Sequence, residues 1–126
     1  MKKIFIIYLF FVFSLVKLSA QQKNTIKIIS DVQIKNNWII VFDTNGKYIS
    51  QMPQSRNEVV GIAGSFFVIT ANGWIVTYDG KCKRIAQIPL SGKQVKGAAG
   101  DTFTVLSNGW IISYDKNCKE KSRRPK

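Results

Sequence analysis

The sequence predicts an all-β protein built from three antiparallel β repeats of about 36 residues. A tryptophan recurs at this spacing, and so do an aspartate and a proline further along each unit. At the centre of the best-formed unit, Asn72-Gly73 is a dipeptide that strongly favours a type I′ hairpin turn, and alternating apolar residues flank it. A fixed period of this length is typical of repeat architectures. The recurring residues are Trp38, Trp74 and Trp110; Asp43, Asp79 and Asp115; and Pro53, Pro89 and Pro125.

The N-terminal segment has the pattern of a secretory signal peptide. Two lysines precede an apolar run from 4 to 16, and a small alanine stands just before the expected cleavage site. The run is shorter than the roughly 20 apolar residues that a membrane span needs. We expect an exported protein, periplasmic or extracellular, with residues 1–20 removed and one domain over residues 21–126. No stable membrane span is expected after cleavage. Retention as an N-terminal anchor is the alternative.

Each repeat is expected to form a propeller-blade-like unit of up to four strands. The repeats span about residues 23–53, 59–89 and 95–125, with a first strand of small residues, a hairpin and a fourth strand that ends at the proline. Gly and Ala in the first strand predict a close approach of backbones, as on the innermost strand of a radial arrangement. The first repeat departs from this pattern at its start, and residues 120–124 of the third are too charged for a strand to be expected. Such end units are typical of capping repeats, or of a strand exchanged with another copy.

The alternation within the hairpin predicts which side chains share a face. One face pairs a small residue with tryptophan, an aliphatic residue with another, and an aromatic residue with another, whereas the other face is mixed. Two partly apolar faces fit packing between neighbouring sheets. The expected pairs are Ala71 with Trp74, Ile69 with Val76 and Phe67 with Tyr78, and, in the third repeat, Ser107 with Trp110, Val105 with Ile112 and Phe103 with Tyr114.

The repeat unit V-x-G-x-A-G…F-x-V-x-x-N-G-W-I-x-x-Y-D…I-x-x-x-P resembles the four-stranded blade of tectonin-like β-propellers over about residues 59–115. It is also similar to the tryptophan-glycine repeats of bacterial exported proteins, which have Gly where this chain has Ile75. Three-repeat β-prism lectins of the monocot mannose-binding type have a similar architecture. The polar residues of their sugar motif fall on Thr70, Asn72 and Trp74, which do not match it. The resemblance therefore implies a repeat β architecture without mannose binding.

Three blades would leave one sheet face uncovered at each end, because propellers usually close with four to eight blades. Two chains of three blades would complete a six-bladed ring by two-fold association. A threefold β-prism or a β-solenoid would solve the problem within one chain. Export allows a disulfide between the two cysteines, Cys82 and Cys118, which are also 36 residues apart. Stacking in a solenoid would bring them within bonding reach, whereas blades or prism faces would separate them.

Little in the sequence points to catalysis. The chain has no histidine, which removes the commonest general base and the commonest metal ligand. The three recurring aspartates are expected to start turns, because a carboxylate accepts backbone N–H groups two residues further on. We expect no enzyme activity, no metal site and no cofactor. An enzyme whose site forms between chains is the least favoured alternative.

The candidate binding residues are aromatic and basic. Sixteen basic and seven acidic residues follow the signal segment, a balance that favours anionic partners, although solubility is the simpler explanation. Symmetric tryptophans beside turns can stack on sugar rings, although packing between units is the simpler explanation. Export argues against nucleic acid as a physiological partner. The candidate ligand-binding residues are Trp38, Trp74 and Trp110, and the candidate anion-binding surface consists of Lys81, Lys83, Arg84, Arg123 and Arg124.

Together these features predict an exported, non-enzymatic β-repeat module for binding or interaction. It is expected to self-associate as a homodimer that completes a propeller-like ring, or to bind a protein or an anionic glycan. The alternative is a small lectin-like glycan-binding protein.

Overall fold

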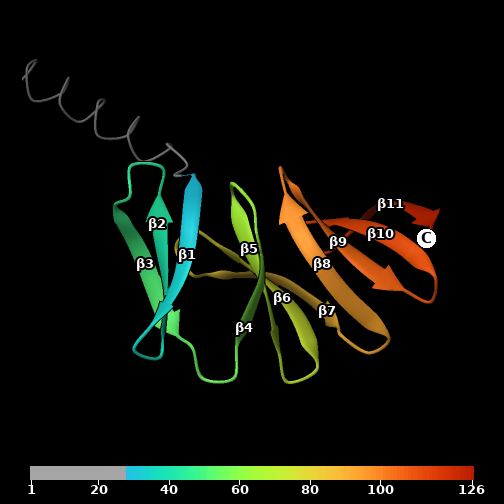
Figure 1. Ribbon diagram of the computed structural model, residues 1–126, viewed down its shortest axis with the longest axis horizontal. Coiled ribbons are helices and arrows are strands. Elements are labelled where there is room, and N and C mark those ends of the chain that lie inside the picture. The colour runs from blue at the N-terminus through green and yellow to red at the C-terminus, as the bar shows by residue number, and fades with distance from the viewer. Residues whose placement is uncertain (1–27) are drawn as a thin grey trace, which may run out of the picture.

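The protein is a row of three twisted antiparallel sheets (Figure 1). The computed structural model describes residues 28–126, which form eleven strands and no helix. This part of the chain accordingly offers no helix long and apolar enough to cross a membrane. Sheet 1 contains β1 (Ile29–Lys35), β2 (Trp38–Asp43) and β3 (Tyr48–Pro53); sheet 2 contains β4 (Glu58–Ile62), β5 (Phe66–Ala71), β6 (Trp74–Asp79) and β7 (Arg84–Pro89); sheet 3 contains β8 (Lys93–Ala99), β9 (Thr102–Ser107), β10 (Trp110–Asp115) and β11 (Glu120–Pro125).

The predicted hairpins are confirmed in their register. Asn72 and Gly73 have φ angles of 51° and 84°, as a two-residue type I′ turn requires. The cross-strand pairs of sheet 2 and sheet 3 are those expected from the alternation of side chains. Sheet 1 has the same register around its Asn36-Asn37 turn, where both residues also have positive φ. Local turn chemistry therefore determines how the strands pair.

The recurring aspartates start turns, as predicted. The Oδ1 atom of Asp79 accepts the backbone N–H of Lys81 at 2.9 Å and that of Lys83 at 3.0 Å. Asp43 and Asp115 make the same two bonds in their own turns. The second bond, four residues along the chain, was not expected. It fixes the backbone of the whole turn, so that the three turns share one shape. The turns at Asp79 and Asp115 reach the preceding sheet.

The sheets pack face to face and bury one hydrophobic cluster in each of the two gaps. The first interface lies between sheets 1 and 2, and the second lies between sheets 2 and 3. Both clusters thus join two neighbouring sheets, whereas a threefold prism would share one core among all three and a solenoid would run its strands in continuous sheets. The three sheets therefore form an open row of blade-like units. The buried residues are Ile29, Ile39, Val41, Phe67, Ile69 and Val76 in the first interface, and Ala63, Phe66, Val68, Ile75, Phe103, Val105, Ile112 and Tyr114 in the second.

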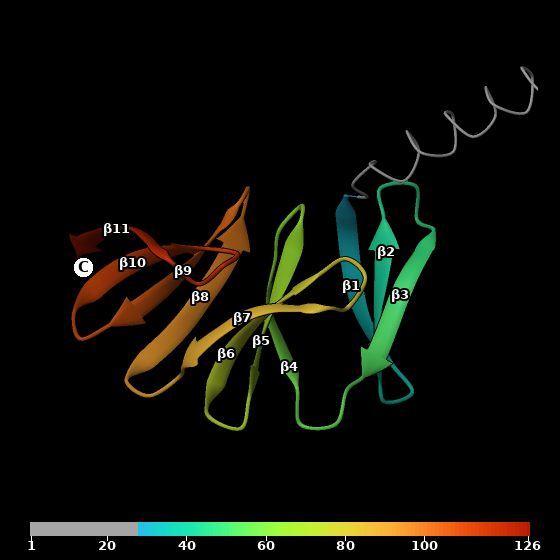
Figure 2. The same cartoon turned by 180° about the vertical axis from the view of Figure 1, so that it is seen from behind.

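The innermost strands of sheets 2 and 3, β4 and β8, approach each other closely, as their small residues predicted. Figure 2 shows the same row of sheets from behind. A Cβ atom built on Gly61 of β4 would lie 3.0 Å from Cβ and 3.1 Å from the backbone nitrogen of Ala98 in β8. Only glycine fits at this contact without a shift of one strand. Sheet 1 has no counterpart of β4 or β8 among the described residues, because β1 pairs with β2 as β5 pairs with β6.

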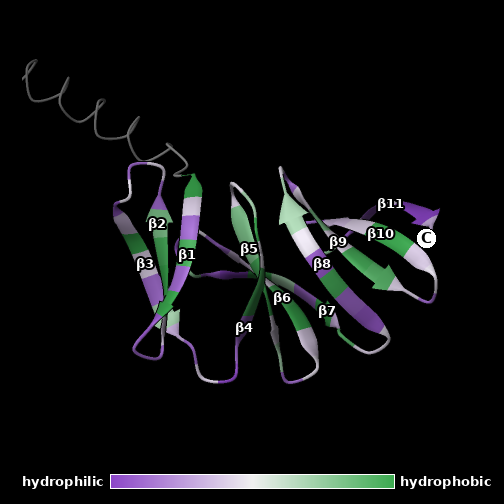
Figure 3. Ribbon diagram, in the orientation of Figure 1, coloured by the Kyte–Doolittle hydropathy of each residue, from purple (hydrophilic) through white to green (hydrophobic). Residues whose placement is uncertain are grey.

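The expectation that residues 120–124 do not form a strand is wrong. They belong to β11, which pairs with β10 along the outer edge of sheet 3 and is the most hydrophilic strand of the sheet (Figure 3). Every residue of β11 is exposed, so the strand buries no apolar side chain. Its backbone pairing with β10 holds it in the sheet. Arg123 adds a salt bridge of 2.6 Å to Glu120, and its guanidinium lies 5.6 Å from the ring centre of Trp110. Charges on an edge strand also discourage pairing with other chains.

The signal peptide predicted for residues 1–20 and the start of the first repeat lie outside the described residues.

Candidate functional site

Among residues 28–126, nothing covers one face of each end sheet, whereas both faces of sheet 2 are buried. Because side chains alternate along a strand, the buried residues of each end sheet identify those that point outward. The outer face of sheet 1 mixes apolar and polar residues, namely Trp38, Ile40 and Phe42 from β2 and Asp31, Gln33 and Lys35 from β1. The outer face of sheet 3 is formed by Thr104 and Leu106 from β9, Ile111 and Ser113 from β10, and Ser122 and Arg124 from β11.

The outer face of sheet 3 is more polar than the equivalent face of sheet 2. In sheet 2, Val68 is fully buried in the second interface and Ile88 packs against it. The residues 36 positions later are Thr104 and Arg124. This change fits either exposure to water or contact with a polar surface.

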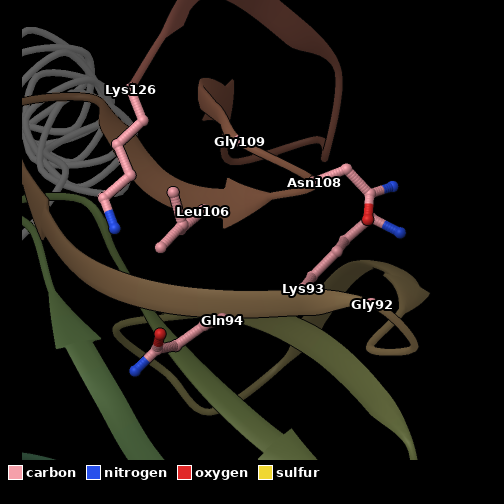
Figure 4. Close-up of a pocket in the computed structure, with 7 residues that line it drawn as sticks. All are labelled: Gly92, Lys93, Gln94, Leu106, Asn108, Gly109 and Lys126. Atoms are coloured by element: carbon pink, nitrogen blue, oxygen red, sulfur yellow. The ribbon is translucent and has the colours of Figure 1, made fainter.

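Two hollows open on this face of sheet 3. The first, which we name the hydroxyl hollow, has a volume of about 260 Å³ and is lined by Thr104, Ile111, Ser113, Ser122, Arg123 and Arg124. The second, the lysine hollow, has a volume of about 450 Å³ and is lined by Gly92, Lys93, Gln94, Leu106, Asn108, Gly109 and Lys126. Figure 4 shows the Leu106 side chain pointing into the lysine hollow, with Lys126 on one side and Lys93 and Asn108 on the other.

A hydroxyl group crosses each of the two internal interfaces and meets a turn of the next sheet. In the first interface, Ser50 Oγ donates to the carbonyl oxygen of Gly80 at 2.7 Å and lies 3.2 Å from the sulfur of Cys82. In the second interface, Thr77 Oγ1 donates to the carbonyl oxygen of Lys116 at 2.6 Å, and Lys116 is 36 residues after Gly80. These carbonyl groups point into a neighbouring sheet, where an unmade hydrogen bond would cost stability.

The two cysteines are free thiols, so the disulfide left open by the sequence is not formed. Cys82 packs in the first interface and Cys118 in the second, as expected for equivalent positions in separate blades. Burial raises the pKa of both thiols, although the hydroxyl of Ser50 or Thr77 opposes this shift. Both therefore remain neutral near pH 7. Their φ angles are 60° and 59°, which is uncommon for a residue other than glycine.

The three tryptophans lie at equivalent places, one on each sheet, and are not brought together in one pocket. Each is about 40% exposed, with values of 40%, 40% and 39% for Trp38, Trp74 and Trp110. Each stands opposite the proline that ends the next strand. None of them lines the hydroxyl or the lysine hollow. Their half-buried rings are compatible both with packing at the rim of a sheet and with ligand stacking.

The predicted basic surface is divided between two sheets. Lys81, Lys83 and Arg84 lie at the turn between β6 and β7, where Arg84 Nη1 donates to Gln87 Oε1 at 3.2 Å. Arg123 and Arg124 lie on β11. The Glu120 carboxylate raises the pKa of Arg123, and Arg123 in turn lowers the pKa of Glu120. The guanidinium of Arg123 is therefore already paired, whereas Arg124 lines the hydroxyl hollow.

Sequence reasoning missed the lysine hollow. An alignment of the repeats contains the signal for it, since Lys126 replaces Leu90 and Gln94 replaces Glu58 at equivalent positions. Leu90 packs against the second interface, and its replacement by lysine indicates that the same place on sheet 3 faces water or an anion.

Residues 28–126 contain no group of three or more Cys, Asp or Glu side chains that could hold a metal ion. Neither the models of known protein families nor the curated proteins include a match to this chain.

Proposed function

We propose that this chain is an exported, non-enzymatic interaction module that self-associates through its end sheets and completes a propeller-like ring. The observation that carries the proposal is the pair of uncovered faces at the ends of an open row of blades. Two copies would supply six sheets, which is within the usual range for closed propellers. The resemblance of the repeats to tectonin-like blades supports the same arrangement.

The contacts in the internal interfaces indicate which residues of the two outer faces would meet between copies, and these residues are chemically complementary. In the second interface the rings of Phe66 and Phe103 meet edge to face, with centroids 6.3 Å apart. At the junction between two copies, the equivalent positions are Thr102 on sheet 3 and Asp31 on sheet 1. An apolar pair is thus replaced by a hydroxyl donor and a carboxylate acceptor, which can form a hydrogen bond. Both partners of the contact are therefore apolar in the second interface and polar at the junction between copies.

The mass of the purified protein in solution tests the proposal. We expect light scattering to give twice the mass of the chain at micromolar concentration, under both reducing and non-reducing conditions, because no disulfide is needed. A monomer at every accessible concentration would contradict self-association, and higher oligomers would contradict a closed ring of two copies.

The lysine hollow favours a second candidate function, the binding of an anionic glycan. Lys93 and Lys126 contribute two positive charges, the amides of Gln94 and Asn108 provide hydrogen bonds, and no acidic residue lines the hollow. Leu106 provides an apolar surface of the kind against which a sugar ring packs. Such a lectin-like protein would recognise sulfated or uronic-acid-containing sugars, and its affinity would fall as salt screens the charges.

The double substitution Lys93→Ala/Lys126→Ala tests this candidate on an array of anionic glycans at low salt. We expect binding to fall at least about tenfold because both charges in the hollow are lost. The matched control, Lys81→Ala/Lys83→Ala, removes two charges from sheet 2 and should retain most of the binding. Equal losses in both variants would instead indicate general attraction of anions.

Trp74→Ala and Trp110→Ala on the same array test whether the tryptophans stack on sugars. Folded variants that lose binding support stacking, whereas unfolding of the variants assigns the tryptophans to packing.

A further inference from the structure

We propose that the hydroxyl hollow of sheet 3 is the receptor for the turn between β2 and β3 of a second copy, with Ser113 and Ser122 donating to that turn. The inference rests on the proposed self-association and specifies how the ring closes. It identifies the occupant of the hollow as Asp43-Thr44-Asn45-Gly46, the turn of sheet 1 that is equivalent to the two turns that meet the preceding sheet within the chain.

The internal interfaces supply the geometry. In each of them, the aspartate-initiated turn that follows the central hairpin reaches back to the preceding sheet and places its second carbonyl group against a hydroxyl. Gly80 meets Ser50, and Lys116 meets Thr77. Since Gly80 and Lys116 are 36 residues apart, the equivalent carbonyl in sheet 1 belongs to Thr44. The turn around Thr44 has the same two carboxylate bonds as the other turns and so the same shape.

The hydroxyl hollow lies on sheet 3 at the position equivalent to those where the internal turns contact sheets 1 and 2. Its serines are 36 residues after Thr77 and 72 residues after Ser50, and they stand directly opposite each other on β10 and β11. In each internal interface only one member of this cross-strand pair carries a hydroxyl: Ser50 is paired with Val41, and Thr77 is paired with Ala86. Sheet 3 thus carries a hydroxyl at both donor positions of the internal interfaces, and within the described part of the chain no turn is hydrogen-bonded to either of them.

The turn and the hollow also match in polarity. The internal turns present a cysteine, and Cys118 packs against an apolar cluster to which Val68 and Ile88 contribute. The turn of sheet 1 has Gly46 in place of the cysteine, and the hollow has Thr104 and Arg124 in place of the valine and the isoleucine. A turn without an apolar side chain would meet a surface with fewer apolar side chains. This correspondence favours a second copy over an unrelated partner.

A disulfide between copies tests the contact. Ser50 Oγ and Cys82 Sγ lie 3.2 Å apart in the first interface, and the equivalent pair across the junction is Ser122 and residue 46. We expect the double variant Ser122→Cys/Gly46→Cys to form a covalent dimer on mild oxidation, visible on a non-reducing gel and lost on reduction. The two natural cysteines adopt φ angles near 60°, so a cysteine is tolerated at position 46, where φ is 72°. The two single variants are the controls and should not cross-link.

A second variant keeps the inference testable without new cysteines. Ser113→Ala/Ser122→Ala should raise the dimer dissociation constant at least about tenfold in sedimentation equilibrium, because the ring has two junctions and each loses its hydrogen bonds. Ser107→Ala, on the opposite face of sheet 3, should leave it unchanged. A protein that is monomeric before any substitution overturns the proposed function itself. A dimer that neither cross-links nor weakens shows that the copies associate elsewhere, which overturns only this inference.

Discussion

Replacing Phe66 with alanine is expected to lower the free energy of unfolding by about 3–5 kcal/mol. The side chain is fully buried in the second interface, where its ring packs edge to face against Phe103. Its loss removes apolar burial and leaves a cavity between two sheets that cannot collapse without moving their backbones. Since a domain of this size is stabilised by only about 5–15 kcal/mol, much of its stability would be lost. Urea unfolding monitored by tryptophan fluorescence measures the change.

The matched control is Phe42→Ala on the outer face of sheet 1. Phe42 is only partly buried, so the same truncation is expected to cost about 1 kcal/mol at concentrations where the protein is monomeric. Similar losses at Phe42 and Phe66 would contradict the assignment of sheet 1 as an end sheet. A loss below about 1 kcal/mol at Phe66 would contradict the second interface as a hydrophobic core.

Gly61→Ala is expected to destabilise the protein by about 2 kcal/mol, although alanine usually stabilises a strand relative to glycine. The added methyl group would lie 3.0 Å from the Cβ atom of Ala98 and 3.1 Å from its backbone nitrogen. Backbone atoms cannot rotate away, so β4 and β8 must separate. The gain from reduced chain entropy, about 0.4–1 kcal/mol, is smaller than the cost of this separation. Thermal unfolding of the two proteins gives the difference.

Gly64→Ala is the control for this prediction. A Cβ atom at Gly64 would lie 3.7 Å from Cγ2 of Ile28, which is an ordinary contact. We expect a change within about 0.5 kcal/mol. Ala98→Gly in the background of Gly61→Ala should recover part of the lost stability because it removes the nearest of the clashing atoms. No recovery would show that the loss has another origin.

The features predicted correctly are those encoded over a few residues. Asn72-Gly73 defines a turn, and alternation then decides that Phe67 faces Tyr78, whose rings stack with centroids 5.6 Å apart. The strand β11 was missed because charged residues have low strand propensity. Its position depends on the backbone of β10 and on the contact of Arg123 with Trp110, neither of which is visible in local sequence.

The hollows could not be predicted in the same way. Alternation places Ser113 and Ser122 on one face, but which face lacks a neighbour depends on how the sheets stack in space. The serines also look ordinary by themselves. They become informative when aligned with Thr77 and Ser50, whose bonds to turn carbonyls appear only in the structure.

The close contact between Gly61 and Ala98 has a consequence for curvature. Inner strands that nearly touch, with wider sheets outside them, make each unit a wedge. The angle of that wedge determines how far each sheet is rotated from the last, and hence how many sheets make a full circle. Larger side chains along β4 and β8 would widen the inner edge and reduce the rotation at each step. In the proposed ring, the small residues at the inner edge would therefore set the number of sheets, and exchanging them for larger residues would change that number.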